Sequence, residues 1–202
     1  GRDLIAEDRP GRAACHECDL GTVAGPASAV AAAAELGGGR LDVLFYNAAV
    51  LEAHPLAKWT VDDWDRSSAV NLRGPFLAAQ AAEPYLRGSG AGRVIVTSST
   101  GALRGHAGMP AYHATKSGLL GLVRALADEL GPAGVTVNAL CPGWVDTPFN
   151  DEFWAHQDDP GAALAALTAS IPLRRQARPE DLVGTFLFLS SSASAYVTGQ
   201  AL

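Results

Sequence analysis

The sequence predicts a doubly wound α/β fold, in which helices cover both faces of a parallel sheet. Two observations predict it: apolar runs of strand length alternate with helix-length segments, and polar or small residues follow the runs. With 202 residues and no internal repeat or low-complexity linker, the chain is long enough for one full-sized core. Residues 1–202 are therefore expected to form a single domain.

The first part of the chain predicts two strands with a helix between them. Residues 12–20 have the length of a short strand, and the alanine-rich residues 27–36 have high helix propensity. Three consecutive glycines, 37–39, end that helix. Residues 41–46 form a continuous apolar run, typical of a strand buried on both faces, and the small residues 47–49 follow it.

The middle of the chain predicts two helices on either side of a buried strand. Thr60, followed three residues later by an acid, marks the start of a helix that extends to residue 85. The Gly74-Pro75 pair either bends this helix or lies in its course. Residues 92–99 predict the strand, and residues 111–130 carry an apolar stripe at helical spacing.

The last part of the chain predicts a further strand over 135–141 and a final helix that begins at Pro179. Between them, residues 147–175 are polar and contain prolines, with a helix expected around 162–170. Long segments beyond a strand end often close over sites, so 147–175 are the expected substrate lid. Residues 196–200 lead toward a final strand.

Composition and charge exclude several classes of function. The net charge of −6 gives no basic surface for nucleic acid or an anionic membrane, so neither is an expected partner. The charged first residues do not fit a signal peptide, and no stretch approaches the roughly 20 apolar residues that span a bilayer. Three cysteines suit a reducing compartment, so a cytoplasmic location is expected.

Cys15 and Cys18 form a C-x-x-C pair around His16. A zinc site needs about four ligands, and the sequence has no second Cys/His cluster, so no metal site is predicted. In a strand, positions three apart point to opposite faces, so the two thiols would diverge. The interpretation is two buried small residues.

Tyr112 and Lys116 are the strongest candidates for chemistry. Four residues apart, they lie one above the other on the helix predicted over 111–130. A phenol has a pKa of about 10, and a neighbouring cation lowers it by favouring the phenolate. The pair could therefore exchange a proton with a substrate oxygen near neutral pH.

The predicted sheet brings other polar residues to the same place. In parallel sheets, ligands bind at the carboxyl ends of the strands. Asp19, Asn47, the pair Ser98-Ser99 and the pair Pro142-Gly143 all lie at or just after the carboxyl ends of predicted strands. We expect them to converge on one crevice with Tyr112.

Seven motifs occur in the order and at the spacing of a known family. They are CDL (18–20), YNAAV (46–50), VNLRG (70–74), VIVTSS (94–99), YHATK (112–116), NALCPGWVDTP (138–148) and YVTGQ (196–200). Each is weak alone, but together they make the chain resemble the short-chain dehydrogenase/reductases from about Asp19 to Leu202. The resemblance implies a Rossmann-like domain and an NAD(P)-dependent oxidoreductase that interconverts a secondary alcohol and a ketone.

The resemblance also implies roles for individual residues. Tyr112 would be the acid/base, and Lys116 would lower its pKa and bond the nicotinamide ribose. Ser99 would bond the substrate carbonyl, with Ser98 structural. Asn71 would hold a water that relays protons from Lys116; the alternative is a helix residue that bonds backbone.

The cofactor contacts carry over in the same way, whether the cofactor is NAD or NADP. Asp19 and the amide of Leu20 would bond the adenine, and Asn47 with Ala48 would line the adenosine ribose. The nicotinamide carboxamide would meet Pro142, Gly143, Val145 and Thr147.

Two features depart from the family pattern. Tyr46 and Ala49 flank the usual Asn-Ala pair and would tighten the approach of backbone to the ribose. The glycine-rich phosphate loop has no counterpart, so the first βα unit is expected to be missing from the printed chain, with residues also absent between Arg2 and Asp19 and after Leu202. We expect the intact protein to be several kilodaltons heavier than 20.8 kDa.

Several points stay open in the sequence. Arg2 either faces the 2′-phosphate of NADP or is a solvated terminal residue. His113 is expected at the surface, because adjacent helix residues diverge by about 100° and it should point away from the crevice. His106 is closer to the substrate mouth in the sequence, but nothing else supports a role for it. Trp144 and the aromatic residues of 149–154 indicate an apolar or a sugar-stacking pocket.

The expected substrate is a small carbonyl or alcohol of the 3-oxoacyl, sugar-acid or cyclic-ketone type. The alternatives are a non-catalytic dinucleotide-binding relative, or an isomerase or lyase on the same fold. The resemblance also implies a homotetramer or homodimer, for which Leu119, Leu122, Leu126 and residues 76–85 offer apolar surface. The same residues could instead pack the core.

Overall fold

A parallel sheet forms the centre of the computed structural model, which describes residues 13–202. Its strands, in spatial order, are β1 (Val43–Tyr46), β2 (Arg93–Thr97) and β3 (Thr136–Leu140). Arg93 pairs with both Val43 and Thr136, so the strands run level and their carboxyl ends share one edge. Ala201 forms a parallel bridge to Ala139 of β3, where the final strand was predicted.

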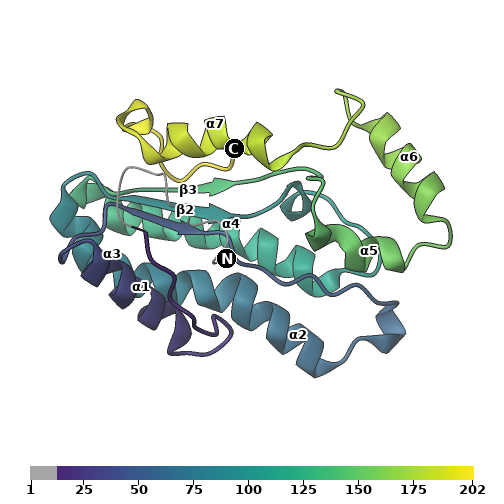
Figure 1. The fold of residues 1–202 in the computed structure, drawn as a ribbon, viewed down its shortest axis with the longest axis horizontal. Coiled ribbons are helices and arrows are strands. Elements are labelled where there is room, and N and C mark those ends of the chain that lie inside the picture. Colours follow the sequence, from purple (N-terminus) through teal and green to yellow (C-terminus); the bar gives the residue numbers. More distant parts are fainter. Residues whose placement is uncertain (1–12) are drawn as a thin grey trace.

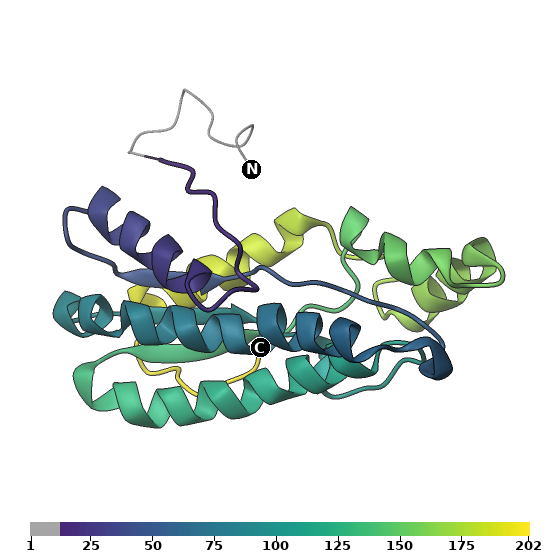
Figure 2. The same ribbon diagram turned by 90° about the horizontal axis from the view of Figure 1, so that it is seen from below.

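Helices cover both faces of this sheet, which confirms the predicted doubly wound α/β fold (Figure 1). On one face lie α1 (Gly25–Leu36), α2 (Val61–Ser68), the π-helix Ala69–Arg73, α3 (Gly74–Ser89) and α4 (Pro110–Leu130); α7 (Pro179–Ser190) lies on the other. Figure 2 shows the continuous rod of α2, π-helix and α3 lying between α1 and α4. Toward the carboxyl edge lie α5 (Asp151–Ala155) and α6 (Pro160–Ser170).

Local sequence sets the helix ends much as predicted. Thr60 and Asp63 form a capping box: the Thr60 hydroxyl accepts from the Asp63 amide at 3.2 Å, and the Asp63 carboxylate accepts from the Thr60 amide at 3.0 Å. Gly37 ends α1, and Gly38 follows with a φ of 67°, which a residue without Cβ adopts easily. Short 3₁₀ turns lie at Leu56–Lys58, Thr100–Ala102, Gly131–Ala133, Pro148–Asn150 and Ser192–Ser194.

The main core fills the space between the sheet and α1, α3 and α4. Its fully enclosed side chains include Leu86 of α3, Val94 of β2, Val137 of β3 and Leu119 of α4. Leu119 is therefore a core residue and does not offer oligomer surface, while Leu122 and Leu126 pack partly buried against the same core. This is the alternative that the sequence left open.

Three expectations at the start of the chain are wrong. Residues 13–19 form no strand, because a strand needs a hydrogen-bonded neighbour and none of the three strands of the described sheet pairs with them. Cys15 is consequently exposed and Cys18 half-buried, and both are free thiols. The strand β1 is not buried on both faces, since the Phe45 side chain is 38% exposed and faces a cavity. Arg2 lies outside the described residues.

Within residues 13–202, no helix combines the length and the apolar character needed to cross a membrane.

Tyr46, which departs from the family pattern, holds the π-helix in place. The Tyr46 hydroxyl donates to the Val70 carbonyl at 2.9 Å, and its ring is 7% exposed. Burial raises the pKa of Tyr46 to about 12, so the phenol stays a hydrogen-bond donor. A Cβ on Gly74 would collide with the same hydroxyl, which explains the glycine at the start of α3.

Substituting Gly74 should therefore reveal the Tyr46 contact. Gly74→Ala is expected to lower the free energy of unfolding by about 1–3 kcal/mol, because the new methyl overpacks against a fixed ring. In a Tyr46→Phe background the cost should shrink, since the colliding oxygen is gone. Urea denaturation of the double-mutant cycle measures the coupling. Gly121→Ala in α4, where a Cβ would meet nothing, is the control and should stabilise by up to about 1 kcal/mol.

Candidate active site

A cavity of about 610 Å³ opens at the carboxyl edge of the sheet, a size typical of small-molecule sites. The structure brings most of the predicted site residues to its wall. They are Asn47, Ala48, Ser99, Tyr112, Lys116, Pro142, Gly143, Val145 and Thr147. Asp19, Leu20 and Asn71 are not among the residues that line it.

Lys116 is a buried cation at the floor of this cavity. Its side chain is 2% exposed, and its ammonium donates to the Thr97 carbonyl at the end of β2 over 2.6 Å. Burial lowers the pKa of Lys116 to about 8, partly opposed by the nearby Cys141. The Ser98 hydroxyl is buried and donates to the Lys116 carbonyl at 2.8 Å, as expected of a structural serine.

Tyr112 lies one turn before Lys116 on α4, with the ammonium 5.6 Å from the centre of its ring. The expected lowering of its pKa is wrong for this structure: burial raises the pKa of Tyr112, and a hydrogen bond with Ser99 only partly opposes the rise. The reason is desolvation of the phenol in the cavity wall, while the Lys116 ammonium donates its hydrogen bond to the Thr97 carbonyl. The phenol is therefore protonated at neutral pH.

Ser99 is fixed by the turn that follows β2. Its hydroxyl oxygen accepts from the Gly101 amide at 2.9 Å and caps the 3₁₀ turn Thr100–Ala102. The Thr100 amide in turn donates to the Pro142 carbonyl at 2.9 Å, which ties this turn to the one after β3. Ser99 can thus donate its proton to a substrate oxygen while it stays beside Tyr112.

Asn71 is buried in the π-helix and bonds backbone. Its side-chain oxygen accepts from the Val50 amide at 2.8 Å, and its side-chain nitrogen donates to the Val50 carbonyl at 2.9 Å. This is the structural alternative that the sequence left open, and the water relay stays a prediction. The bonds fix the segment after β1 against the helices, next to the cavity wall at Ala48 and Ala49.

The residues around Lys116 suit the nicotinamide end of a dinucleotide. The Asn47 side-chain oxygen already accepts from the Thr97 hydroxyl at 2.7 Å, which orients its amide group at the cavity wall. Val145 bridges Ala177 in parallel, so the turn after Pro142-Gly143 is braced by a second segment. Amide, ammonium and backbone groups of this kind are the donors and acceptors that a ribose and a carboxamide need.

Asp19 and Leu20 lie beside the start of α1, apart from the cavity wall. The Asp19 carboxylate accepts from the Gly21 amide at 2.8 Å, and its carbonyl accepts from the Thr22 hydroxyl at 2.8 Å. The side chain therefore shapes the turn into α1, and its contact with adenine stays a prediction.

His113 lines the cavity, so its expected surface position is wrong. One ring nitrogen lies 2.7 Å from the Gly101 carbonyl, and the other accepts from the His106 amide at 3.0 Å. Nδ1 must therefore carry the proton. The geometry differs from the expectation because the segment between β2 and α4 folds back over the helix, where it covers His113. His106 also lines the cavity, and burial lowers its pKa, with smaller effects of His113 and Arg104.

Trp144 and Phe149 line the cavity, and the rings of Phe153 and Trp154 pack against Trp144. The Trp144 ring lies 4.9 Å from that of Phe153 and 5.2 Å from that of Trp154, and Phe149 lies 6.2 Å from Tyr112. The opposite wall was missed in the sequence: Phe45, Leu182, Val183 and Phe186 line it. Phe45 belongs to the apolar run 41–46, and Leu182, Val183 and Phe186 belong to the last predicted helix; both patterns fit ordinary core packing equally well.

Known proteins resemble this chain in sequence and in fold. A family model described as enoyl-(acyl carrier protein) reductase matches residues 3–202. The chain is 39% identical over 164 residues to a Thauera aromatica protein, subunit BbsD of (2S)-[(R)-hydroxy(phenyl)methyl]succinyl-CoA dehydrogenase, covering 81% of this chain and 63% of that protein. The chain thus spans less than two thirds of this relative's length.

Two solved structures share the fold. One, with NADP at low occupancy, is of a Beutenbergia cavernae protein classed as an NAD(P)-dependent gluconate 5-dehydrogenase; the TM-score is 0.82 and the identity 35%, over 91% of this chain and 72% of that one. The other is levodione reductase, with a TM-score of 0.85 and 29% identity over 92% of this chain and 72% of that one.

The buried ammonium should give stability a pH dependence. Because the pKa of Lys116 is about 8 in the folded chain and 10.5 ordinarily, the unfolded chain binds more protons between these values. The contribution of Lys116 to the free energy of unfolding should therefore rise from about pH 8 toward pH 10.5. In Lys116→Met this rise should be absent, as chemical denaturation across that range would measure.

Lys58→Met removes one exposed lysine and serves as the control for loss of a positive charge. Parallel pH profiles for the wild type and Lys116→Met would show that Lys116 keeps its ordinary protonation and is not buried as described.

Proposed function

Since the chain belongs to the short-chain dehydrogenase/reductase family, we propose that it interconverts a secondary alcohol and a ketone by hydride transfer, with NAD or NADP as cofactor. The observation that carries the proposal is the grouping of Ser99, Tyr112 and Lys116 at one cavity wall. Residues 147–175 would act as the lid of this catalytic domain, since Thr147, Phe149 and Asn150 line the cavity.

In this mechanism the bound cofactor supplies or accepts the hydride, and the chain supplies the proton. In the reduction direction, the ketone oxygen accepts hydrogen bonds from Ser99 and Tyr112, and the Tyr112 phenol gives its proton as charge develops on that oxygen. Burial raises the pKa of Tyr112, so the proton donor is the form present at neutral pH. In the oxidation direction the phenolate takes the proton back.

Lys116 supports both directions from its buried position. Its hydrogen bond to the Thr97 carbonyl holds the ammonium beneath the Tyr112 ring, where its charge favours the phenolate once that form arises. The same group and the amide of Asn47 would hold the nicotinamide ribose. Pro142, Gly143, Val145 and Thr147 would position the carboxamide, which fixes the ring face toward the substrate.

The cavity favours an apolar, ring-bearing substrate among the three expected types. Trp144, Phe149 and Met109 line it, and among the lining residues within 13–202 Lys116 is the only lysine or arginine. A sugar acid would lack a further cation for its carboxylate, whereas an aryl group would gain aromatic contacts. The name of the Thauera aromatica relative describes a secondary alcohol carbon that bears a phenyl ring, which supports the ring-bearing part of this substrate class.

Replacing Tyr112 tests the proposed chemistry. Tyr112→Phe should lower the rate of ketone reduction by at least about a hundredfold, because the ring stays and only the proton donor is lost. Cofactor absorbance reports the turnover, and cofactor fluorescence should show unchanged binding. In the wild type, reduction should slow and alcohol oxidation should accelerate as pH rises through the pKa of Tyr112. Equal turnover by the variant would overturn the assignment.

Replacing Trp144 tests the substrate class. Trp144→Ala should raise KM for an aryl ketone about tenfold or more, with a smaller effect on a short acyclic ketone, because aromatic contact is lost only for the former. Trp64→Ala, on α2 and 44% exposed, is the matched control and should change neither constant. A wild type that prefers sugar acids to aryl ketones would contradict the substrate class but leave the Tyr112 chemistry standing.

A further inference from the structure

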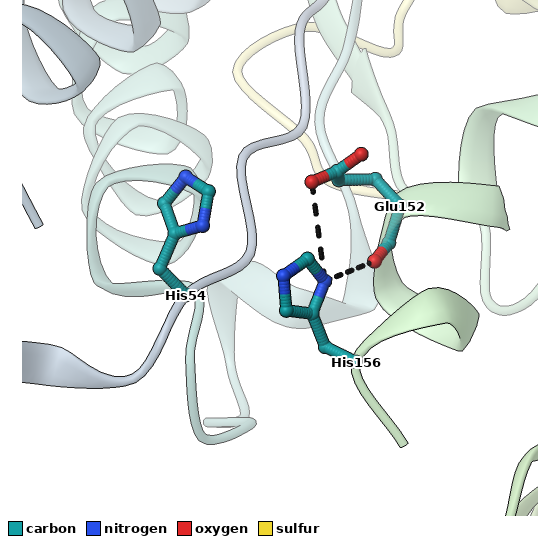
Figure 3. Close-up of side chains that lie close together, drawn as sticks. All are labelled: His54, Glu152 and His156. Carbon is teal, nitrogen blue, oxygen red and sulfur yellow. Dashed lines mark hydrogen bonds and ion pairs between the residues drawn. The ribbon is translucent and has the colours of Figure 1, made fainter. Parts of the chain in front are cut away.

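A cluster of three metal-ligating side chains lies where the lid meets the segment after β1, outside the residues that line the cavity. His54 belongs to the segment between β1 and α2, Glu152 to α5, and His156 follows α5 directly. One ligand atom from each lies within 4.8 Å of the others. Figure 3 shows His54 on one segment opposite His156 and Glu152 on the other, with the Glu152 carboxylate above the His156 ring.

The hydrogen bonds of His156 leave one of its nitrogens available. Its Nδ1 lies 2.8 Å from the Glu152 carbonyl, a group that can only accept, so Nδ1 carries the proton. Nε2 then keeps its lone pair, and Figure 3 shows this second nitrogen on the side of the ring toward His54. A backbone carbonyl that fixes the tautomer of a histidine in this way is the usual support for a metal-binding imidazole.

His54 is held independently, from the other side. Its amide donates to the Gly108 carbonyl at 2.9 Å, and its carbonyl accepts from the Trp59 indole at 3.0 Å. Its ring lies 5.6 Å from that of His156, edge to face, and its Nε2 is 3.9 Å from the Glu52 carboxylate. The backbone at His54 is thus anchored while the ring reaches toward α5.

We propose that His54, Glu152 and His156 bind a divalent transition-metal ion, with Zn²⁺ as the natural probe. Two imidazoles and one carboxylate are ligands that Zn²⁺ accepts, and water can complete its four-coordinate shell. The side chains of His54, Glu152 and His156 are 26%, 45% and 39% exposed, so an ion can enter from solvent. None of the three lines the cavity, so the ion ties the lid to the segment after β1 and takes no part in proton transfer.

Two other sets of side chains could bind Zn²⁺, and the experiment must distinguish them from the proposed site. Asp63, with Glu52 and His54, makes a second three-ligand group, but its carboxylate already accepts from Thr60 in the α2 capping box. The thiols of Cys15 and Cys18 are free and could bind Zn²⁺ through sulfur, although in residues 13–202 they belong to no three-ligand group.

Metal titration distinguishes these sets. Isothermal titration of Zn²⁺ into the purified protein should give one site, and the affinity should fall at least about tenfold in His156→Asn and in Glu152→Gln. Both positions are exposed, so these variants should keep the unfolding midpoint measured without metal. The control variants His16→Asn and the double variant Cys15→Ser/Cys18→Ser should bind Zn²⁺ as the wild type does. The spectrum of the Co²⁺ complex should lack a thiolate charge-transfer band.

The proposed link between the lid and the segment after β1 can be measured by proteolysis, which does not depend on the proposed oxidoreductase activity. Zn²⁺ should slow chymotryptic cleavage at Phe153 and Trp154 of α5 in the wild type severalfold, but not in His156→Asn. Absence of saturable binding, full affinity in His156→Asn, or loss of binding only in the cysteine variant would overturn the site. Binding with an unchanged cleavage rate would overturn the link.

Discussion

The buried ammonium of Lys116 is the constraint on which the rest of the site depends. A cation that is 2% exposed needs strong acceptors, and the Thr97 carbonyl supplies one at 2.6 Å where β2 ends. This bond and the one from Ser98 to the Lys116 carbonyl join the strand end to the middle of α4. They set the rotation of α4, which places Tyr112, one turn earlier, over the cavity.

The same burial changes the pKa values of both ionisable groups, Lys116 and Tyr112. Desolvation lowers the pKa of Lys116 and raises the pKa of Tyr112, so each group is pushed toward its neutral form. In the proposed mechanism Tyr112 gives up its proton, and the resulting phenolate favours the ammonium form of Lys116, so the two titrations are coupled. Under the proposed mechanism, the favourable interaction between Tyr112 and Lys116 is therefore strongest in the transition state and weaker in the resting cavity.

The sequence predicted the sheet, most helices and most of the cavity wall, because these depend on short-range patterns. Apolar runs define β1 to β3. Thr60 and Gly37 set helix ends through local hydrogen bonds, and Pro179 does so through its fixed φ in the first turn. The failures were at positions decided by tertiary contacts. Residues 13–19 lack a strand neighbour, and the position of His113 depends on a loop that folds back over α4. No pattern could show that the pKa of Tyr112 rises, since burial is a property of the fold.

The cluster at His54 was invisible in the sequence for a related reason, and it changes how the lid is understood. Its ligands come from segments that are distant along the chain and meet only where α5 approaches the segment after β1. Phe153 and Trp154 pack against Trp144, so an ion that fixes α5 also fixes Trp144 in the wall of the cavity. If a substrate prefers the same placement of that wall, linkage requires that substrate and ion each raise the affinity for the other. On these proposals, substrate specificity and metal binding both act on the lid, while the proposed proton chemistry lies at the ends of the strands and on α4.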